Sequence, residues 1–402
     1  MKKKVVSLLL AAAMTTAALA GCGSSNGSSS SDASTGADST SATSASASTD
    51  GEKKDAAGEK IAMITDSGDI TDESFNQITW ETVCAYGDAN GVEYEYYKPA
   101  EDTDEERINS IDLAVSEGAT VVVMPGYLFG PAIAEEQDTY PDVTFIAVDV
   151  TEGDIVKNGK AVDLGKNVYI CSFEEEQAGY LAGYAAVKDG YTSLGFLGGI
   201  AVPAVIRFGY GYVQGINAAA EEDGVDVNVK YYYGGQFYGD ANITSRMEGW
   251  YSNGTQVVFA CGGGIYTSAV EAALKNNGYV IGVDVDQNYI GANGVEKDGY
   301  AYNPFITSAM KGLSESVSTA LGDIEAGEWS NIAATNGNFG LEDGDYVGLP
   351  TADDSWNFKT FTKDEYEALK SKIASGELVV DNSSDDATKP TVSEFTNVTY
   401  IQ

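Results

Sequence analysis

A polar loop over residues 65–77 holds the side chains in this sequence best suited to ligand chemistry. It contains Asp66, Phe75 and Asn76 within a run of Asp, Ser, Thr and Gly. An aromatic ring can stack on a planar ligand while a neighbouring carboxylate and amide read its polar edges. Phe75 could instead pack onto its own helix, and Asp72 could cap that helix. The loop therefore predicts one wall of a ligand site.

A second aromatic residue, Phe208, occupies a similar place later in the chain. Phe75 and Phe208 each stand near the start of an expected helix, and these helices end at the similar dipeptides Gly91-Val92 and Gly224-Val225. Two rings at equivalent places favour an aromatic clamp with one ring on each side of a ligand.

Two aspartates, Asp149 and Asp284, each follow a short apolar run that reads as a buried strand. One carboxylate can accept hydrogen bonds from two vicinal hydroxyls, such as those at the 2′ and 3′ positions of a ribose. Either aspartate could instead cap the turn after its strand. Both are candidate ligand contacts.

Gly263 and Lys311 complete the candidate set. The Gly262–Gly264 run permits close approach of the backbone to a ligand, but no Lys-Ser or Lys-Thr follows, so a phosphate cradle is not indicated. Lys311 lies at the expected start of an apolar helix, from which it could reach a ligand hydroxyl or Asp284. It could equally be a solvated surface residue.

The composition argues against several kinds of function. The 402 residues include no His, which excludes a Ser-His-Asp triad and every His-containing metal site. The formal net charge of −38 repels nucleic acid and phosphates. The aspartates at 66, 69 and 72 lack the spacing of a calcium loop. We therefore expect no metal, no cofactor, no nucleic-acid partner and no enzymatic activity.

Short apolar runs alternate with helical patterns from residue 61 onward, which is typical of βαβ units and parallel sheets. The series occurs twice, with similar stretches in the same order. The sequence predicts an α/β fold with two Rossmann-like lobes, a hinge, and a ligand cleft between the carboxyl ends of the two sheets. We expect the first lobe to comprise 61–172 plus about 303–336, and the second 173–302 plus about 337–402.

The first residues read as an export signal. Three lysines precede an apolar run and Leu19-Ala20-Gly21-Cys22 follows, a pattern similar to a bacterial lipobox. That resemblance implies removal of residues 1–21 and attachment of lipid to Cys22. Residues 22–60, rich in Ser, Ala, Thr and Gly, are expected to form a disordered tether. We expect a monomer held on the outer side of the cell membrane.

Together these residues resemble the basic membrane protein family, the nucleoside-binding lipoproteins of ABC importers with a type I periplasmic-binding fold. The likeness covers roughly residues 61–350. The stretches that carry it are Asp66–Gln77 with Trp80, Gln177–Gly183, Gly195–Phe208, Gly262–Gly264, Gly282–Gln287, and Thr307-Ser308 with Lys311. The sequence departs from the family pattern at Tyr302–Phe305 and in its longer tail, 379–402.

The resemblance implies capture of a purine nucleoside and delivery to ABC permease subunits. It implies that Asp66, Phe75 and Asn76 hold one side of the ligand and that Phe208 supplies the opposing ring. It also implies that Asp284 and Lys311 contact the ribose hydroxyls, near the Gly263 backbone. Two alternatives remain on the residues alone: a sugar or autoinducer-type ligand on the same fold, and a calcium-dependent nucleoside hydrolase.

Overall fold

The computed structural model describes residues 59–402. The expected leader, Cys22 and nearly all of the expected tether lie outside the described residues. Lys60, the last residue assigned to the tether, already begins the first strand.

The first sheet contains six strands that all run parallel. Every residue of β3, Val-Val-Val-Met-Pro, is buried, as expected for a parallel strand covered on both faces. In spatial order the strands are β13 (Thr335–Phe339), β7 (Val168–Phe173), β4 (Thr144–Val148), β3 (Val121–Pro125), β1 (Lys60–Ile64) and β2 (Glu93–Tyr97).

The second sheet contains seven strands, of which only the short β14 runs antiparallel. Its outer strand β15 comes from the C-terminal tail and pairs along β9, so the tail covers an edge of this sheet. The spatial order is β14 (Val347–Gly348), β12 (Phe305–Lys311), β11 (Tyr279–Asp284), β10 (Val257–Cys261), β8 (Ser193–Gly198), β9 (Val227–Tyr233) and β15 (Thr396–Ile401). A separate hairpin joins β5 (Val156–Lys157) to β6 (Lys160–Ala161).

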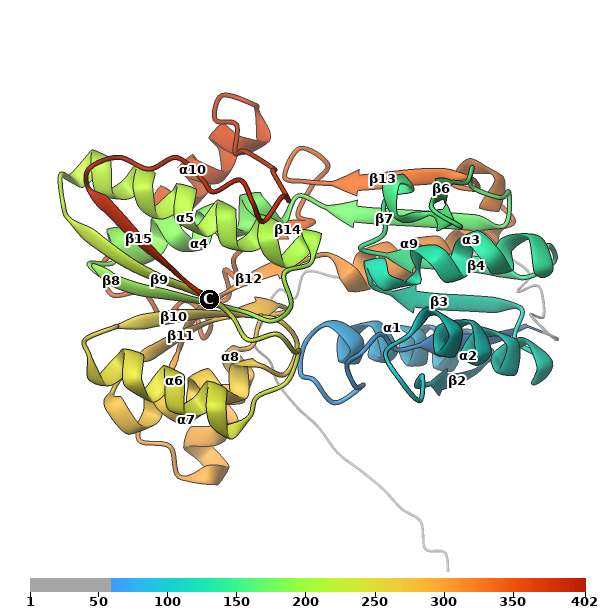
Figure 1. Ribbon diagram of the computed structural model, residues 1–402, viewed down its shortest axis with the longest axis horizontal. Helices are drawn as coiled ribbons and strands as arrows, with labels where there is room; N and C mark the ends of the chain where they lie inside the picture. The colour runs from blue at the N-terminus through green and yellow to red at the C-terminus, as the bar shows by residue number, and fades with distance from the viewer. Residues whose placement is uncertain (1–58) are drawn as a thin grey trace, which may run out of the picture. The chain divides into compact units, whose positions relative to one another are not determined.

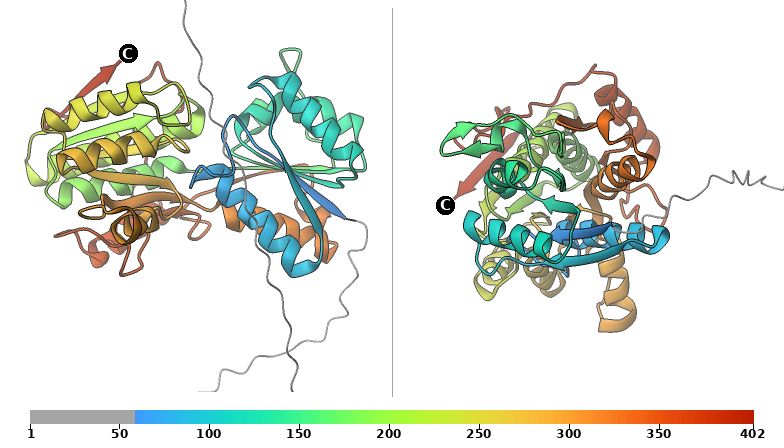
Figure 2. Two further views of the ribbon diagram at one scale, coloured as in Figure 1. Left: turned by 90° about the horizontal axis from the view of Figure 1, so that it is seen from below. Right: turned by 90° about the vertical axis from the view of Figure 1, so that its right-hand side faces the viewer.

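Helices cover both faces of each sheet. Alternate residues of β1 face opposite ways: Ile61 and Met63 pack in the cluster that includes α1 and α9, whereas Ala62 and Ile64 pack with α2 and α3. Figure 2 (left) shows these two pairs of helices on opposite sides of the first sheet. In the second sheet α4 and α5 lie on one side and α6 and α7 on the other (Figure 1). The helices are α1 (Phe75–Asn90), α2 (Asp104–Ser116), α3 (Gly130–Thr139), α4 (Glu175–Lys188), α5 (Pro203–Asp223), α6 (Ala241–Ser252), α7 (Tyr266–Asn276), α8 (Asn288–Asn293), α9 (Leu313–Ala326) and α10 (Lys363–Ala374).

The chain passes between the two sheets three times. It leaves the first sheet after β7, returns to the first-sheet helix α9 after β12, and leaves again after β13. The expectation that residues 303–311 belong to the first lobe is wrong, because β12 pairs with β11 in the second sheet. The return to the first lobe follows Lys311.

The expected α/β architecture of two similar units is confirmed. The repeat extends to the backbone, because α1 and α5 both end at a left-handed glycine, Gly91 with φ of 70° and Gly224 with φ of 63°. Among residues 59–402, no helix combines the length and the apolarity that a membrane span requires.

Candidate ligand-binding site

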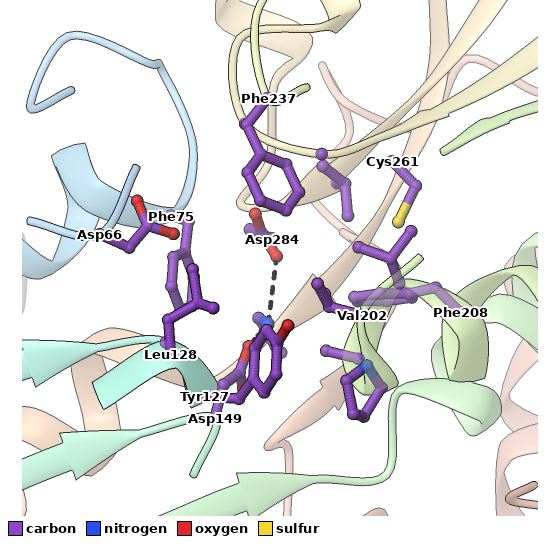
Figure 3. A pocket seen from close by; sticks show the side chains of 18 of the residues that line it. Asp66, Phe75, Tyr127, Leu128, Asp149, Val202, Phe208, Phe237, Cys261 and Asp284 are labelled. Carbon is purple, nitrogen blue, oxygen red and sulfur yellow. Dashed lines mark hydrogen bonds and ion pairs between the residues drawn. The ribbon is translucent and has the colours of Figure 1, made fainter. Parts of the chain in front are cut away.

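A cavity of about 760 Å³, which includes space open to solvent, lies where the carboxyl ends of strands from both sheets meet. Residues that follow β1, β3 and β4 line it from the first sheet, and residues that follow β8, β10 and β11 line it from the second. Figure 3 shows the labelled side chains converging on this space. All eight predicted site residues line the cavity: Asp66, Phe75, Asn76, Asp149, Phe208, Gly263, Asp284 and Lys311.

Lys311 is the centre of a buried cluster of charges. It is the last residue of β12 and not the start of a helix, which corrects the expectation from the sequence. The side chain is 3% exposed, and its Nζ pairs with Asp149 of the first lobe and lies 3.6 Å from Asp284 Oδ1. Glu175 Oε1 lies 3.7 Å from the same nitrogen. Burial alone would lower the pKa of Lys311, but the surrounding carboxylates raise it above its ordinary value, so the side chain stays charged.

The two predicted aspartates have the same unusual backbone conformation. Asp149 directly follows β4 and Asp284 is the last residue of the equivalent strand β11, with left-handed φ values of 59° and 66°. Such a conformation is costly for a non-glycine residue and is concentrated at functional sites. Within the described chain neither carboxylate accepts a bond from a backbone N–H, so neither caps a turn. Asp149 Oδ1 has no partner there, and burial raises the pKa of this carboxyl despite the charge of Lys311.

The loop before α1 is held by its own polar side chains. Asp72 caps the helix by accepting bonds from the backbone N–H groups of Ser74, Asn76 and Gln77 at 2.9–3.1 Å, which confirms the capping alternative. The Asn76 amide nitrogen donates to Asp66 Oδ1 at 2.9 Å and to Asp72 Oδ2 at 3.0 Å. Asn76 therefore positions Asp66, whose second oxygen is left for a ligand.

Three phenylalanines line the cavity, and they differ in how much ring they offer. Phe208 is 1% exposed and packs edge-on against Phe259 at 6.0 Å, within the core of the second lobe. Phe75 and Phe237 are only half-buried, and Figure 3 shows them entering the cavity from different sides. Phe237 is thus a better candidate than Phe208 for the ring opposite Phe75.

Phe237 was not predicted from the sequence. It lies in the loop that follows the tyrosine-rich strand β9, so its position after an expected strand was the signal that could have found it. Gly263, with φ of 49°, lies against this loop: a Cβ there would be 3.1 Å from the carbonyl oxygen of Phe237. The predicted close approach at Gly263 therefore serves the loop that carries Phe237.

Arg207 and Glu175 were also missed. Glu175 is fully buried at the start of α4, and Arg207 Nε donates to its Oε2 at 2.6 Å. For Arg207 the available signal was a single charge inside a stretch of small and apolar residues, whereas Glu175 lies within the acidic run Glu174–Glu176 and carried no such signal. Across residues 59–402, no group of three or more His, Cys, Asp or Glu side chains is arranged to hold a metal ion.

Contacts between the loops before α1 and α8 join the two lobes at the edge of the cavity. The Ser74 hydroxyl donates to Asp284 Oδ2 at 2.6 Å, and the fully buried Gln287 donates from Nε2 to the carbonyl oxygen of Glu73 at 2.9 Å. The hydroxyl of Tyr289 donates to the Glu73 carboxylate. These bonds can form only when the two loops are together, so they stabilise a closed cleft.

The chain resembles known proteins in sequence and in fold. The family described as ABC transporter substrate-binding protein PnrA-like matches residues 59–384. A protein of Lactococcus lactis subsp. cremoris named ABC transporter nucleoside-binding protein BmpA is 29% identical over 324 residues, 77% of this chain and 82% of that protein. A CD4+ T-cell-stimulating antigen of Listeria innocua is 30% identical over 346 residues, 82% of this chain and 90% of the antigen.

A crystal structure of ABC transporter solute-binding proteins from Aeropyrum pernix K1 has a TM-score of 0.69 at 20% identity and covers 82% of this chain and 95% of that one. This likeness confirms the predicted type I periplasmic-binding fold. The family match confirms the resemblance drawn from the sequence and identifies a substrate-binding family instead of an enzyme family. The chain belongs to the PnrA-like (basic membrane protein) family of ABC transporter substrate-binding proteins.

Proposed function

We propose that this protein captures a nucleoside, with a purine base preferred, between its two lobes. The observation that carries the proposal is the pair of left-handed aspartates, Asp149 and Asp284, with Lys311 between them. A ribose offers two vicinal hydroxyls, each of which can donate to a carboxylate oxygen and accept from the ammonium group. The unpartnered Asp149 Oδ1 is an acceptor that such a hydroxyl would satisfy.

The other walls of the cavity suit a flat, largely apolar base. Phe75 and Phe237 offer ring surface, and Tyr127, Leu128 and Val202 add apolar surface. Stacking on aromatic rings stabilises a bound base by about 1–3 kcal/mol per base. Asp66, fixed by Asn76, would accept a hydrogen bond from the edge of the base.

Two further lines support a nucleoside over a sugar alone. A simple sugar has no flat base to cover the ring surface of both Phe75 and Phe237. The Lactococcus relative is named a nucleoside-binding protein, and the net charge of −38 disfavours a phosphorylated ligand.

We further propose that residues 1–21 are removed, that lipid on Cys22 anchors the protein outside the cytoplasm, and that residues 22–59 form the tether. The loaded monomer would then pass its ligand to ABC permease subunits of an importer. The lobes would consist of 60–173 with 313–339, and 174–311 with 340–402, following the sheet to which each strand belongs.

Titration calorimetry with inosine, guanosine, adenosine, cytidine and ribose tests the ligand. We expect heat with the purine nucleosides and little with ribose; tight ribose binding without nucleoside binding would refute the proposal. Release of free base would indicate a hydrolase. Asp66→Asn should weaken nucleoside binding about tenfold, which corresponds to one hydrogen bond to a charged group. Asp69→Asn is the matched control, because Asp69 is in the same loop but pairs with Lys98 outside the cavity.

A further inference from the structure

Arg207 lines the same cavity but uses only part of its hydrogen-bonding capacity in the protein. Its Nε donates to Glu175 Oε2 at 2.6 Å and lies 4.0 Å from Glu176 Oε2. The three side chains are 13%, 0% and 3% exposed, so the guanidinium is held firmly from one side. Arg207 lies near the start of α5, whose Pro203 fixes the first turn at the edge of the cavity.

The terminal nitrogens of Arg207 have no hydrogen-bond partner within residues 59–402. A guanidinium has five N–H donors, and the bond from Nε accounts for one of them. If the only task of Arg207 were to neutralise Glu175, nothing would require this residue to line the cavity. A cavity-lining arginine with unused donors points to an acceptor on the ligand.

The neighbouring charges indicate which acceptor this is. Glu175 bonds Arg207 through one oxygen and approaches Lys311 Nζ to 3.7 Å with the other, so Arg207 lies directly beside the lysine–aspartate cluster. In the proposed site, Asp149 and Asp284 take the two vicinal hydroxyls, which donate hydrogen bonds to them. Arg207 can only donate, so it requires an oxygen that the carboxylates leave free. On the ribose of a nucleoside the free oxygens are the ring oxygen and the 5′ oxygen, and of these only the 5′ oxygen belongs to a hydroxyl that projects from the sugar.

We propose that Arg207 determines specificity by donating its terminal N–H groups to the 5′ oxygen of the bound nucleoside. This inference rests on the proposed function and adds a requirement to it: the ligand must keep its 5′ oxygen. Hydrogen bonds from a charged donor are stronger than neutral ones, so loss of the 5′ oxygen should weaken binding about 10- to 100-fold.

A double-mutant cycle between protein and ligand tests the proposal. Wild type, Arg207→Met and Arg207→Lys are titrated with inosine and with its 2′-, 3′- and 5′-deoxy derivatives. We expect 5′-deoxyinosine to bind wild type at least tenfold more weakly than inosine, but to bind Arg207→Met within about twofold of inosine. Losses from 2′ and 3′ deoxygenation should be the same in wild type and variants. Arg207→Lys keeps the positive charge beside Glu175. It shows whether any weaker binding by Arg207→Met comes from loss of that charge or from poor folding.

The outcomes separate this inference from the proposed function. If wild type binds no nucleoside, the proposed function fails and this inference fails with it. If wild type binds inosine but the loss caused by 5′ deoxygenation is equal in wild type and Arg207→Met, only the role of Arg207 is refuted. That role is also refuted if the coupling appears at the 2′ or 3′ position instead.

Discussion

The buried cluster around Lys311 predicts a large and pH-dependent loss of stability on Lys311→Met. The substitution keeps an unbranched side chain of similar length but leaves Asp149, Asp284 and Glu175 together without their common cation. At an effective dielectric constant near 20, each pair at 3.6–3.7 Å contributes roughly 4–5 kcal/mol of Coulomb attraction. Desolvation of the lysine offsets much of this sum. Breaking a buried ion pair costs about 3–5 kcal/mol. We expect Lys311→Met to lose this much free energy of unfolding at pH 8.

The sign of the pH dependence follows from the carboxylates that remain. Burial already raises the pKa of Asp149, and without Lys311 nothing opposes that rise. The folded variant therefore takes up a proton at a higher pH than the unfolded chain does, and its stability recovers as the pH falls. The deficit relative to wild type should be largest at pH 8 and clearly smaller at pH 5.

Urea unfolding of the two proteins between pH 5 and pH 8 measures this difference. The double variant Lys311→Met/Asp149→Asn removes one of the buried carboxylates left without a cation. It should regain part of the lost free energy of unfolding at pH 8. A free energy of unfolding for Lys311→Met within about 1 kcal/mol of wild type across this range would show that the cluster is not a stabilising network. A deficit that does not change with pH would contradict the assigned charges.

Three further predictions concern other parts of the molecule. Burial, and next the charge of Glu175, raise the pKa of Glu176 from 4.5 to about 8. The free energy of unfolding should therefore decrease as the pH rises between these two values. Glu176→Gln should flatten this pH dependence in thermal melts. Gln287→Ala removes a buried bond between the lobes and should raise the nucleoside dissociation rate about tenfold with little change in the association rate, measured by stopped-flow fluorescence. Phe237→Ala should weaken nucleoside binding about tenfold with little loss of stability, whereas Phe208→Ala should cost about 3–5 kcal/mol of unfolding free energy. Equal effects of the last two substitutions on binding and on stability would contradict the roles assigned to the rings.

Much of the fold was predictable because parallel strands are buried on both faces. The apolar run at β3 could form little else at its length, and its neighbours repeat the pattern. Residues at the carboxyl ends of such strands, including Asp149 and Asp284, lie in the cavity for the same reason. Prediction from the sequence failed where placement depends on longer loops, as for Phe237.

The wrong prediction that Lys311 starts a helix, instead of ending β12, has a physical cause. Phe305–Lys311 is a short apolar run that fits a strand or a helix start equally well, and only its pairing with β11 decides between them. Arg207 and Glu175 were missed because their bond depends on how the starts of α4 and α5 pack together, which the sequence pattern does not show. Similarly, no pattern in the sequence of the tail predicts that β15 pairs with β9.

The most direct test of nucleoside capture between the lobes is a crystal structure of the protein grown with inosine. We expect a purine between Phe75 and Phe237, with ring separations of about 3.5–4 Å. We also expect the two vicinal ribose hydroxyls at hydrogen-bond distance from Asp149 and Asp284. A ligand bound outside this cavity, or a ribose turned away from these carboxylates and from Lys311, would contradict the proposed mode of binding.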